Sequence, residues 1–171
     1  IEFFGGTVDG SNLVVTGSGD DGIDYADGWN GNGTNWYIGG AAKGAIEGSN
    51  NGDDGNATPT TTTTLTNITV VGPVSEGALY YKEGGGNVTV VNMFVEGVDL
   101  GVKYKTSDSA ALSRIANGDL TVDIHFANSA TGFEYTSENA NSAPTWMTIT
   151  TDNTGAGNGA SKPDWTNGWT K

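Results

Sequence analysis

Short runs of alternating apolar and polar residues recur along the whole chain. Apolar–polar–apolar triplets begin at Ile1, Ile23, Ile46, Ala78, Val102 and Phe133. Each triplet is followed by a second run of strand-forming residues, at residues 13–15, 36–38, 68–71, 88–91, 122–126 and 146–149. Period-2 alternation predicts β-strands, and the Gly, Asn, Asp and Ser residues between the runs predict turns.

The spacing of the triplets indicates a repeat with variable loops. Successive triplets begin 22, 23, 32, 24 and 31 residues apart. A stacked coil tolerates inserts at fixed corners, and the extra residues fall near 49–64 and 107–118. The pattern therefore predicts one all-β domain over residues 1–171, a parallel β-helix (β-solenoid) of about six coils, with a Trp-containing tail at 155–171. Helical periodicity is confined to residues 107–116, where we expect one short turn, and an antiparallel sandwich remains the alternative.

Composition supports a narrow core with many turns. The chain has 28 Gly, only 4 Pro and 35% apolar residues. Asn67, Asn87 and Asn92 are expected at strand ends, where stacked amides form ladders. The absence of Cys excludes disulfides and thiol catalysis.

The charge balance restricts the possible partners. Asp and Glu number 20 against 7 Lys and Arg, which gives a formal net charge of -13. Nucleic acid is not expected as a partner, because binding it requires a basic face. No membrane span is visible, and the acidic excess favours divalent cations or a solvated acidic surface.

The densest acidic stretch is the candidate ion site. Asp20, Asp21, Asp24 and Asp27 offer hard oxygen ligands of the kind that calcium prefers. Strand alternation places Asp21 and Asp24 on opposite faces, so the four converge only if the chain bends. Aligned coils would stack Glu2 and Glu47 on either side of Asp24, and a solvated turn is the alternative.

The two ends of the chain predict self-association. Ile1, Phe3 and Phe4 begin directly in a strand, which leaves an unpaired edge, and Trp165 and Trp169 lie near the other end. The tryptophans either cap the last coil or dock on another subunit, and head-to-tail addition of this kind produces filaments. A start without Met indicates a processed form or a fragment.

Several stretches together resemble a known family. They read Glu-Phe-Phe-Gly-Gly-Thr-Val at 2–8, Asp-Asp-Gly-Ile-Asp-Tyr at 20–25, Gly-Trp-Asn-Gly at 28–31, Ile-Glu-Gly-Ser-Asn-Asn at 46–51, Ala-Thr-Pro at 57–59 and Leu-Thr-Asn-Ile-Thr-Val-Val-Gly at 65–72. Over residues 2–101 the chain resembles the C-terminal part of bacterial exported β-helix proteins of the pectate-lyase-like superfamily, which include surface lipoproteins and multidomain secreted proteins. The resemblance implies a right-handed β-helix outside the cell or at its outer surface, without a defined activity.

Catalytic motifs are weak. Lyases of this fold use calcium with an Arg or Lys base, but the only arginine is Arg114, in a polar loop, and Lys82, Lys103 and Lys105 have no adjoining carboxylate cluster. The Gly-His-Gly and Arg-Ile-Lys motifs of the hydrolases are absent, and His125 lies inside an alternating strand. These weak motifs do not decide whether the protein is an enzyme, and they favour a non-catalytic role.

Other features suggest glycans. Trp29, Trp36, Tyr37, Tyr80, Tyr81 and Tyr104 form either an external stacking strip or core ladders. Asn32, Asn56, Asn67 and Asn87 begin Asn-X-Thr triplets, which permit N-glycosylation or occur by chance.

The charge balance, the chain ends and the resemblance together give the expected function. We expect an extracellular structural subunit that assembles end to end into a homopolymer. The alternative is a polysaccharide-binding or polysaccharide-degrading module of a larger secreted protein.

Overall fold

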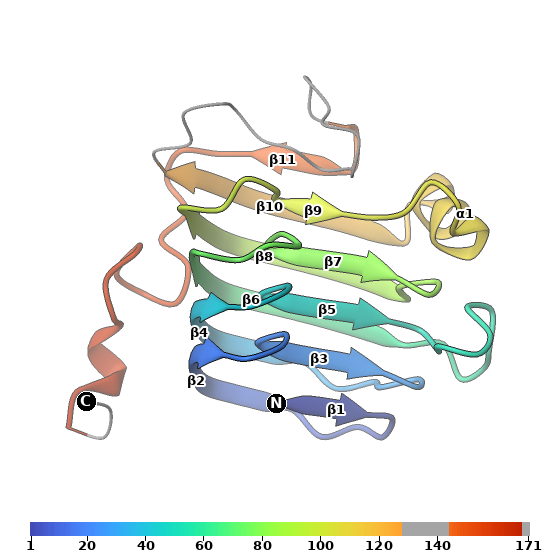
Figure 1. Ribbon diagram of the computed structural model, residues 1–171, viewed down its shortest axis with the longest axis horizontal. Coiled ribbons are helices and arrows are strands. Elements are labelled where there is room, and N and C mark those ends of the chain that lie inside the picture. Colours follow the sequence, from blue (N-terminus) through green and yellow to red (C-terminus); the bar gives the residue numbers. More distant parts are fainter. Residues whose placement is uncertain (128–143, 169–171) are drawn as a thin grey trace.

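The computed structural model describes residues 1–127 and 144–168, and its strands stack as the coils of a parallel β-helix (Figure 1). One sheet has the order β1-β3-β5-β7-β9 and the other the order β11-β10-β8-β6-β4-β2. The short strands of the first sheet are β1 (Glu2–Phe4), β3 (Ile23–Ala26), β5 (Ile46–Ser49), β7 (Leu79–Lys82) and β9 (Val102–Lys103). The second sheet contains β2 (Gly10–Ser18), β4 (Gly33–Ala41), β6 (Thr62–Val71), β8 (Asn87–Glu96), β10 (Leu120–Ala127) and β11 (Met147–Ile149).

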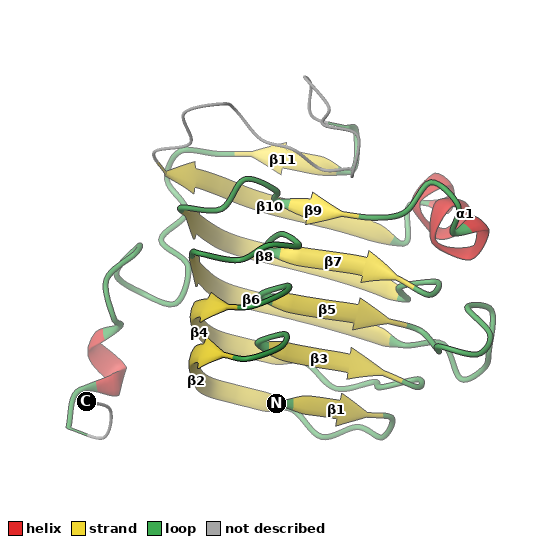
Figure 2. Cartoon of the chain, in the orientation of Figure 1, coloured by secondary structure: helices red, strands yellow, loops and turns green. Residues whose placement is uncertain are grey.

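Every named strand pairs in parallel with its neighbours in the stack. This pairing confirms the β-helix and rules out the antiparallel sandwich for the described strands. The two sheets face each other across the core, as Figure 2 shows. Alternate residues point inward and form apolar columns, such as the column of Ile23, Ile46, Leu79 and Val102, all fully buried. The five triplets that lie within the described residues therefore mark the first sheet, and the second runs mark the other.

The long strands bend at a column of asparagines. Asn12, Asn35, Asn67 and Asn92 have φ between 57° and 59°, a left-handed conformation that asparagine tolerates better than most residues. Their side-chain amides are hydrogen-bonded from coil to coil, with Nδ2–Oδ1 distances of 2.8–3.0 Å. The predicted ladder is therefore confirmed for two residues, Asn67 and Asn92. Asn67 and Asn92 lie within β6 and β8 and not at strand ends as expected, whereas Asn87 does start β8, opposite Thr62, and is not part of the ladder.

Both predicted inserts are present as excursions from the coil. Residues 50–61 connect β5 to β6. The side-chain amide of the buried Asn50 donates hydrogen bonds to the Gly55 and Ala57 carbonyls and so holds this loop in place. The second insert forms α1 (Ser109–Asn117), which is longer than the single turn that we expected. Asp108 caps this helix by accepting a hydrogen bond from the Ala111 amide, and Gly118 ends it in the left-handed region. No described helix has the length and apolarity needed to cross a membrane.

The C-terminal segment corrects the predicted end cap. After β11 the chain returns along the outside of the long-stranded sheet and ends in a short 3-10 helix, η1 (Asp164–Thr166) (Figure 1). The Ala156 amide donates to Thr69 Oγ1 on β6, and the Tyr37 hydroxyl on β4 donates to the Ala160 carbonyl. Trp165 donates its indole N–H to the Ala156 carbonyl, so it folds onto its own segment beside the sheet and does not cover the last coil. Trp169 and the Phe133 triplet lie outside the described residues.

The first coil keeps apolar side chains in contact with solvent. Ile1, Phe4 and Val8 are 54%, 63% and 71% exposed. Phe3 points inward and stacks on Trp29 with ring centroids 4.7 Å apart. Of the residues predicted for an assembly interface, Ile1 and Phe4 are therefore exposed, and Phe3 belongs to the core.

Candidate functional site

The outer face of the short-stranded sheet carries a charged column that runs from coil to coil. Glu2 pairs with Asp24, Asp24 with Glu47, Glu47 with Tyr80, and Tyr80 with Lys103. These positions alternate with the buried columns, so their side chains point away from the core. The prediction that Glu2 and Glu47 flank Asp24 is confirmed, and the column changes from acidic to basic along the stack.

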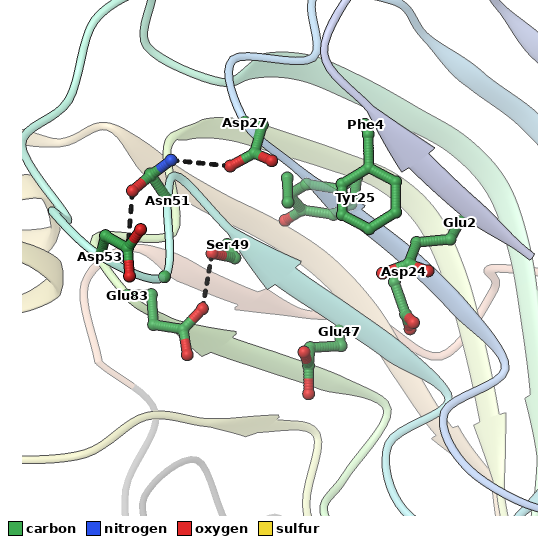
Figure 3. A pocket seen from close by; sticks show the side chains of 12 residues that line it. Glu2, Phe4, Asp24, Tyr25, Asp27, Glu47, Ser49, Asn51, Asp53 and Glu83 are labelled. Carbon is green, nitrogen blue, oxygen red and sulfur yellow. Dashed lines mark hydrogen bonds between the residues drawn. The ribbon is translucent and has the colours of Figure 1, made fainter.

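The acidic half of this column forms a hollow that we call the acidic groove. The carboxylates that line it are Glu2, Asp24, Asp27, Glu47, Asp53 and Glu83. Figure 3 shows Glu2, Asp24 and Glu47 side by side on successive strands, with the loop after β5 closing one end. The rim is held by hydrogen bonds from Asn51 Nδ2 to Asp27 Oδ1 and from Ser49 Oγ to Glu83 Oε2, each 2.8 Å long.

Asp24 is the most perturbed carboxyl group of the acidic groove. Partial burial, and then in order the negative charges of Asp21, Glu47 and Glu2, together raise its pKa from 3.8 to about 7. Its Oδ1 atom is shielded from solvent and has no hydrogen-bond partner. Burial also raises the pKa of Glu47, but there the Lys82 ammonium opposes the shift. The two neighbouring carboxyl groups therefore differ because Glu47 has a lysine hydrogen-bonded to it, whereas Asp24 has only the weaker field of the N-terminal ammonium.

The other half of the face forms what we call the lysine groove. It is lined by Lys43, Glu47, Ser75, Glu76, Tyr80, Lys82, Lys103 and Lys105. Lys82 Nζ lies 2.9 Å from Glu47 Oε1, and Lys103 Nζ lies 2.7 Å from Glu76 Oε1. The Lys103 ammonium is also 4.5 Å from the centre of the Tyr80 ring, within the range of a cation–π contact.

The predicted calcium ligands are distributed among different partners. Asp20 is paired with Lys43 at 2.5 Å, and Asp27 accepts a hydrogen bond from Asn51. The buried Asp21 accepts the Gly44 amide at 2.6 Å, and Asp24 lies on the outer face of β3. Among the described residues, no three of these four bring ligand atoms within 4.8 Å of one another. The structure thus gives no common position for one ion, and calcium binding by this set stays a prediction.

A different carboxylate group does converge. Oxygens of Asp21, Glu47 and Glu76 lie within 4.8 Å of one another, and we call these three residues the carboxylate cluster. Each member faces a lysine: Lys43 at 4.0 Å from Asp21, Lys82 beside Glu47 and Lys103 beside Glu76. Calcium requires 6–8 oxygen ligands. Three carboxylates that are already balanced by three ammonium groups do not fit a calcium ion.

The suggested aromatic strip was wrong for half of its six members, which pack in the core instead. Trp29, Trp36 and Tyr81 are fully buried. Tyr80 is on the outer face but only 4% exposed, since Lys103 and Lys82 cover its ring. The tyrosine at position 37 is held by the C-terminal segment, and the one at position 104 packs edge-to-face against a tryptophan. A sugar ring therefore has no open aromatic platform in the lysine groove.

The remaining candidates lie away from both grooves. Arg114, in α1, approaches Asp119 at 3.6 Å. His125 packs against Phe94 and its Nδ1 lies 3.0 Å from the Asn153 carbonyl, which agrees with a strand residue rather than a catalyst.

The glycosylation candidates occupy different environments. Asn32, Asn56 and Asn87 are exposed, whereas the amide of Asn67 is engaged in the asparagine ladder. Modification of the three exposed residues stays a prediction.

The comparisons with known proteins come down to one match. The family model described as pectate-lyase like beta helix domain matches residues 1–170. No curated protein and no solved structure matches the chain. The family match extends well beyond residues 2–101, over which the sequence stretches carried the resemblance.

Proposed function

This chain belongs to the pectate-lyase-like β-helix domain family, and on that premise we propose that it is a β-solenoid module that binds an acidic polysaccharide in the lysine groove. Family membership supplies the scaffold, and the function must be argued from the site. A solenoid presents a long outer face on which a polymer contacts several coils at once. An extracellular or cell-surface location is part of the proposal, since such polymers occur there.

One observation carries the proposal: the lysine groove gathers four of the chain's seven basic residues, Lys43, Lys82, Lys103 and Lys105, on one face. In a chain with a net charge of -13, an even distribution of the basic residues would not place more than half of them in one groove. Carboxylates of the protein already pair with three of these lysines, but their ammonium groups keep further donors for a ligand. Lys105 is exposed and pairs with no described carboxylate.

Uronate carboxylates are the groups that such a surface would recognise. Ammonium groups bind anions through charge-assisted hydrogen bonds. The adjacent Glu47 and Glu76 would accept hydrogen bonds from sugar hydroxyls and hold the lysine side chains in place. Aromatic stacking plays no part, because Tyr80 is covered by lysines. Cleavage of the polymer is not included in the proposal.

The test compares binding of polygalacturonate with binding of uncharged dextran by isothermal titration calorimetry. We expect only polygalacturonate to bind. The double variant Lys43→Gln/Lys105→Gln changes the two exposed lysines of the groove. An exposed ion pair contributes up to about 1 kcal/mol, so losing two should weaken binding roughly tenfold. Lys162→Gln, in the C-terminal segment, is the control. Equal binding of both polymers, or equal affinity of the double variant and wild type, would refute the proposal.

End-to-end self-association is a second candidate, and the exposed apolar residues of the first coil favour it. Ile1, Phe4 and Val8 are apolar and exposed on the first coil, where β1 is the edge strand of its sheet, and Phe4 also lines the acidic groove. The C-terminal tryptophan at position 165 is not part of this contact, since it lies beside the long-stranded sheet. Sedimentation velocity over a hundredfold concentration range should show association that Phe4→Ser weakens. A monomer at every concentration would exclude this candidate.

A further inference from the structure

We propose that Lys43, Lys82 and Lys103 take the place of a metal ion at the carboxylate cluster, so that this face needs no calcium to fold or to bind a glycan. The glycan part of the inference rests on the proposed function, whereas the calcium part does not. The carboxylate cluster is the only group of three metal-ligating side chains that converges within the described residues. It is therefore the place where a resident ion would be sought first.

The arrangement alternates acidic and basic groups across successive coils. Asp21 precedes β3, Glu47 is in β5, and Glu76 precedes β7. Three carboxylates brought within 4.8 Å of one another repel strongly unless a cation lies among them. The three lysines supply that charge from the turn before β5, from the end of β7 and from β9. The formal charge of these six groups is zero, although Lys43 is also paired with Asp20 at 2.5 Å and Lys82 with Glu83 at 3.3 Å.

Lys82 and Lys103 are held in position and are not loose surface groups, whereas the Lys43 side chain is 53% exposed. The side chains of Lys82 and Lys103 are only 22% and 18% exposed. Their ammonium groups lie 5.6 Å and 4.5 Å from the centre of the Tyr80 ring, which fixes both on the same aromatic surface. Although burial alone would lower the pKa of Lys82, Glu47 and Glu83 raise it, so this residue stays charged.

Other oxygen atoms near the cluster already take part in hydrogen bonds. Asp21 Oδ1 accepts the Gly44 amide, and the Ser75 hydroxyl donates to the Ala42 carbonyl at 2.7 Å. An incoming calcium ion would have to displace ammonium groups that are already hydrogen-bonded to Glu47 and Glu76. Calcium is therefore expected to bind only when the lysines are removed.

The experiment measures thermal unfolding and calcium binding of the whole chain in EGTA and in 5 mM calcium. Wild type should show the same unfolding midpoint in both buffers and no heat of calcium binding at the cluster. Lys82→Met/Lys103→Met keeps the aliphatic packing on Tyr80 and removes two charges. This variant should be destabilised in EGTA and regain about 3 °C or more with calcium, because a ligand of the native state raises its stability.

Lys105→Met is the matched control, because it lies in the same groove without an ion pair to a described carboxylate. It should respond to calcium no more than wild type does. If the double variant does not fold, Lys103→Met alone takes its place. A calcium-dependent midpoint in wild type would overturn the inference, and so would a lysine variant that folds without gaining calcium binding.

Polygalacturonate titrations in the same two buffers separate this inference from the proposed function. Equal affinity with and without calcium supports both. Absence of binding in both buffers refutes the proposed function, while the unfolding measurements still decide the inference. Binding that requires calcium refutes the inference and leaves the glycan-binding module standing.

Discussion

Asp24→Asn is the substitution that tests the electrostatics of the acidic groove most directly. Asp24 lies between Glu2 and Glu47 in the outer column, and no described lysine pairs with it. Burial first and then three neighbouring carboxylates raise its pKa from 3.8 to about 7. Asparagine has the same shape and no charge, so the variant removes the repulsion and retains the packing.

The sign of the pH dependence follows from this raised pKa. Between pH 3.8 and about pH 7 the folded protein holds a proton on Asp24 that the unfolded chain has released. Stability must therefore fall as the pH rises through this window, and the loss is complete above it. A fully buried group with this shift would lose about 4 kcal/mol, at about 1.4 kcal/mol per pH unit. Asp24 is half-buried, so solvent screening reduces the expected loss to about 1–2 kcal/mol.

The assay is urea unfolding of wild type and Asp24→Asn at several pH values between 4 and 8.5. At pH 4 the two proteins should have nearly equal free energies of unfolding, and at pH 8 the variant should be more stable by about 1–2 kcal/mol. Asp152→Asn, in the exposed segment after β11, removes the same charge far from the column and should change neither value. If the difference between wild type and Asp24→Asn stays constant across the pH range, the repulsion in the column is not what the structure implies.

Three further predictions test the coil itself. Gly48→Ala places a Cβ where the neighbouring coil packs a buried tyrosine ring, so urea unfolding should show a loss of about 1–3 kcal/mol, whereas Gly19→Ala, with open space around it, should be neutral. Asn67→Gly keeps the left-handed backbone and removes two amide hydrogen bonds, which should lower the free energy of unfolding by about 1–3 kcal/mol. Thr69→Val removes the acceptor of the Ala156 amide, and hydrogen exchange at Ala156 should become about tenfold faster. Unchanged values would show that these contacts do not stabilise the protein.

The fold could be predicted because its strongest signal is local and repeated. Ile23 and Ile46 start their triplets, and both are fully buried in one column. The ladder was harder to place, because the asparagines that bend the long strands lie within the strands and not at their ends. Asn12 and Asn35 occupy the same place in the repeat as Asn67, a signal that aligned second runs would have revealed.

The site could be predicted only for residues whose neighbours are determined by the register of the paired strands. The stacking of Glu2, Asp24 and Glu47 followed from aligning the triplets, and the structure has that register. The carboxylate cluster could not be found in this way, because Asp21 and Glu76 belong to the turns that enter β3 and β7. Turn residues converge according to the path of the backbone, which alternation along a strand does not determine.

The lysine groove shows how a strongly acidic chain can still build a local cation surface. Lys43 comes from a turn, and Lys82 and Lys103 come from the ends of two strands, so no fixed spacing in the sequence indicates them. They meet because their long side chains reach across neighbouring coils. The register of the paired strands determines the height of each side chain along the stack. The stack converts a sparse set of lysines into one surface, and the carboxylates beside them keep it from repelling itself. A net charge therefore excludes partners for the molecule as a whole, whereas the ligand of a solenoid is selected by the one face that it contacts.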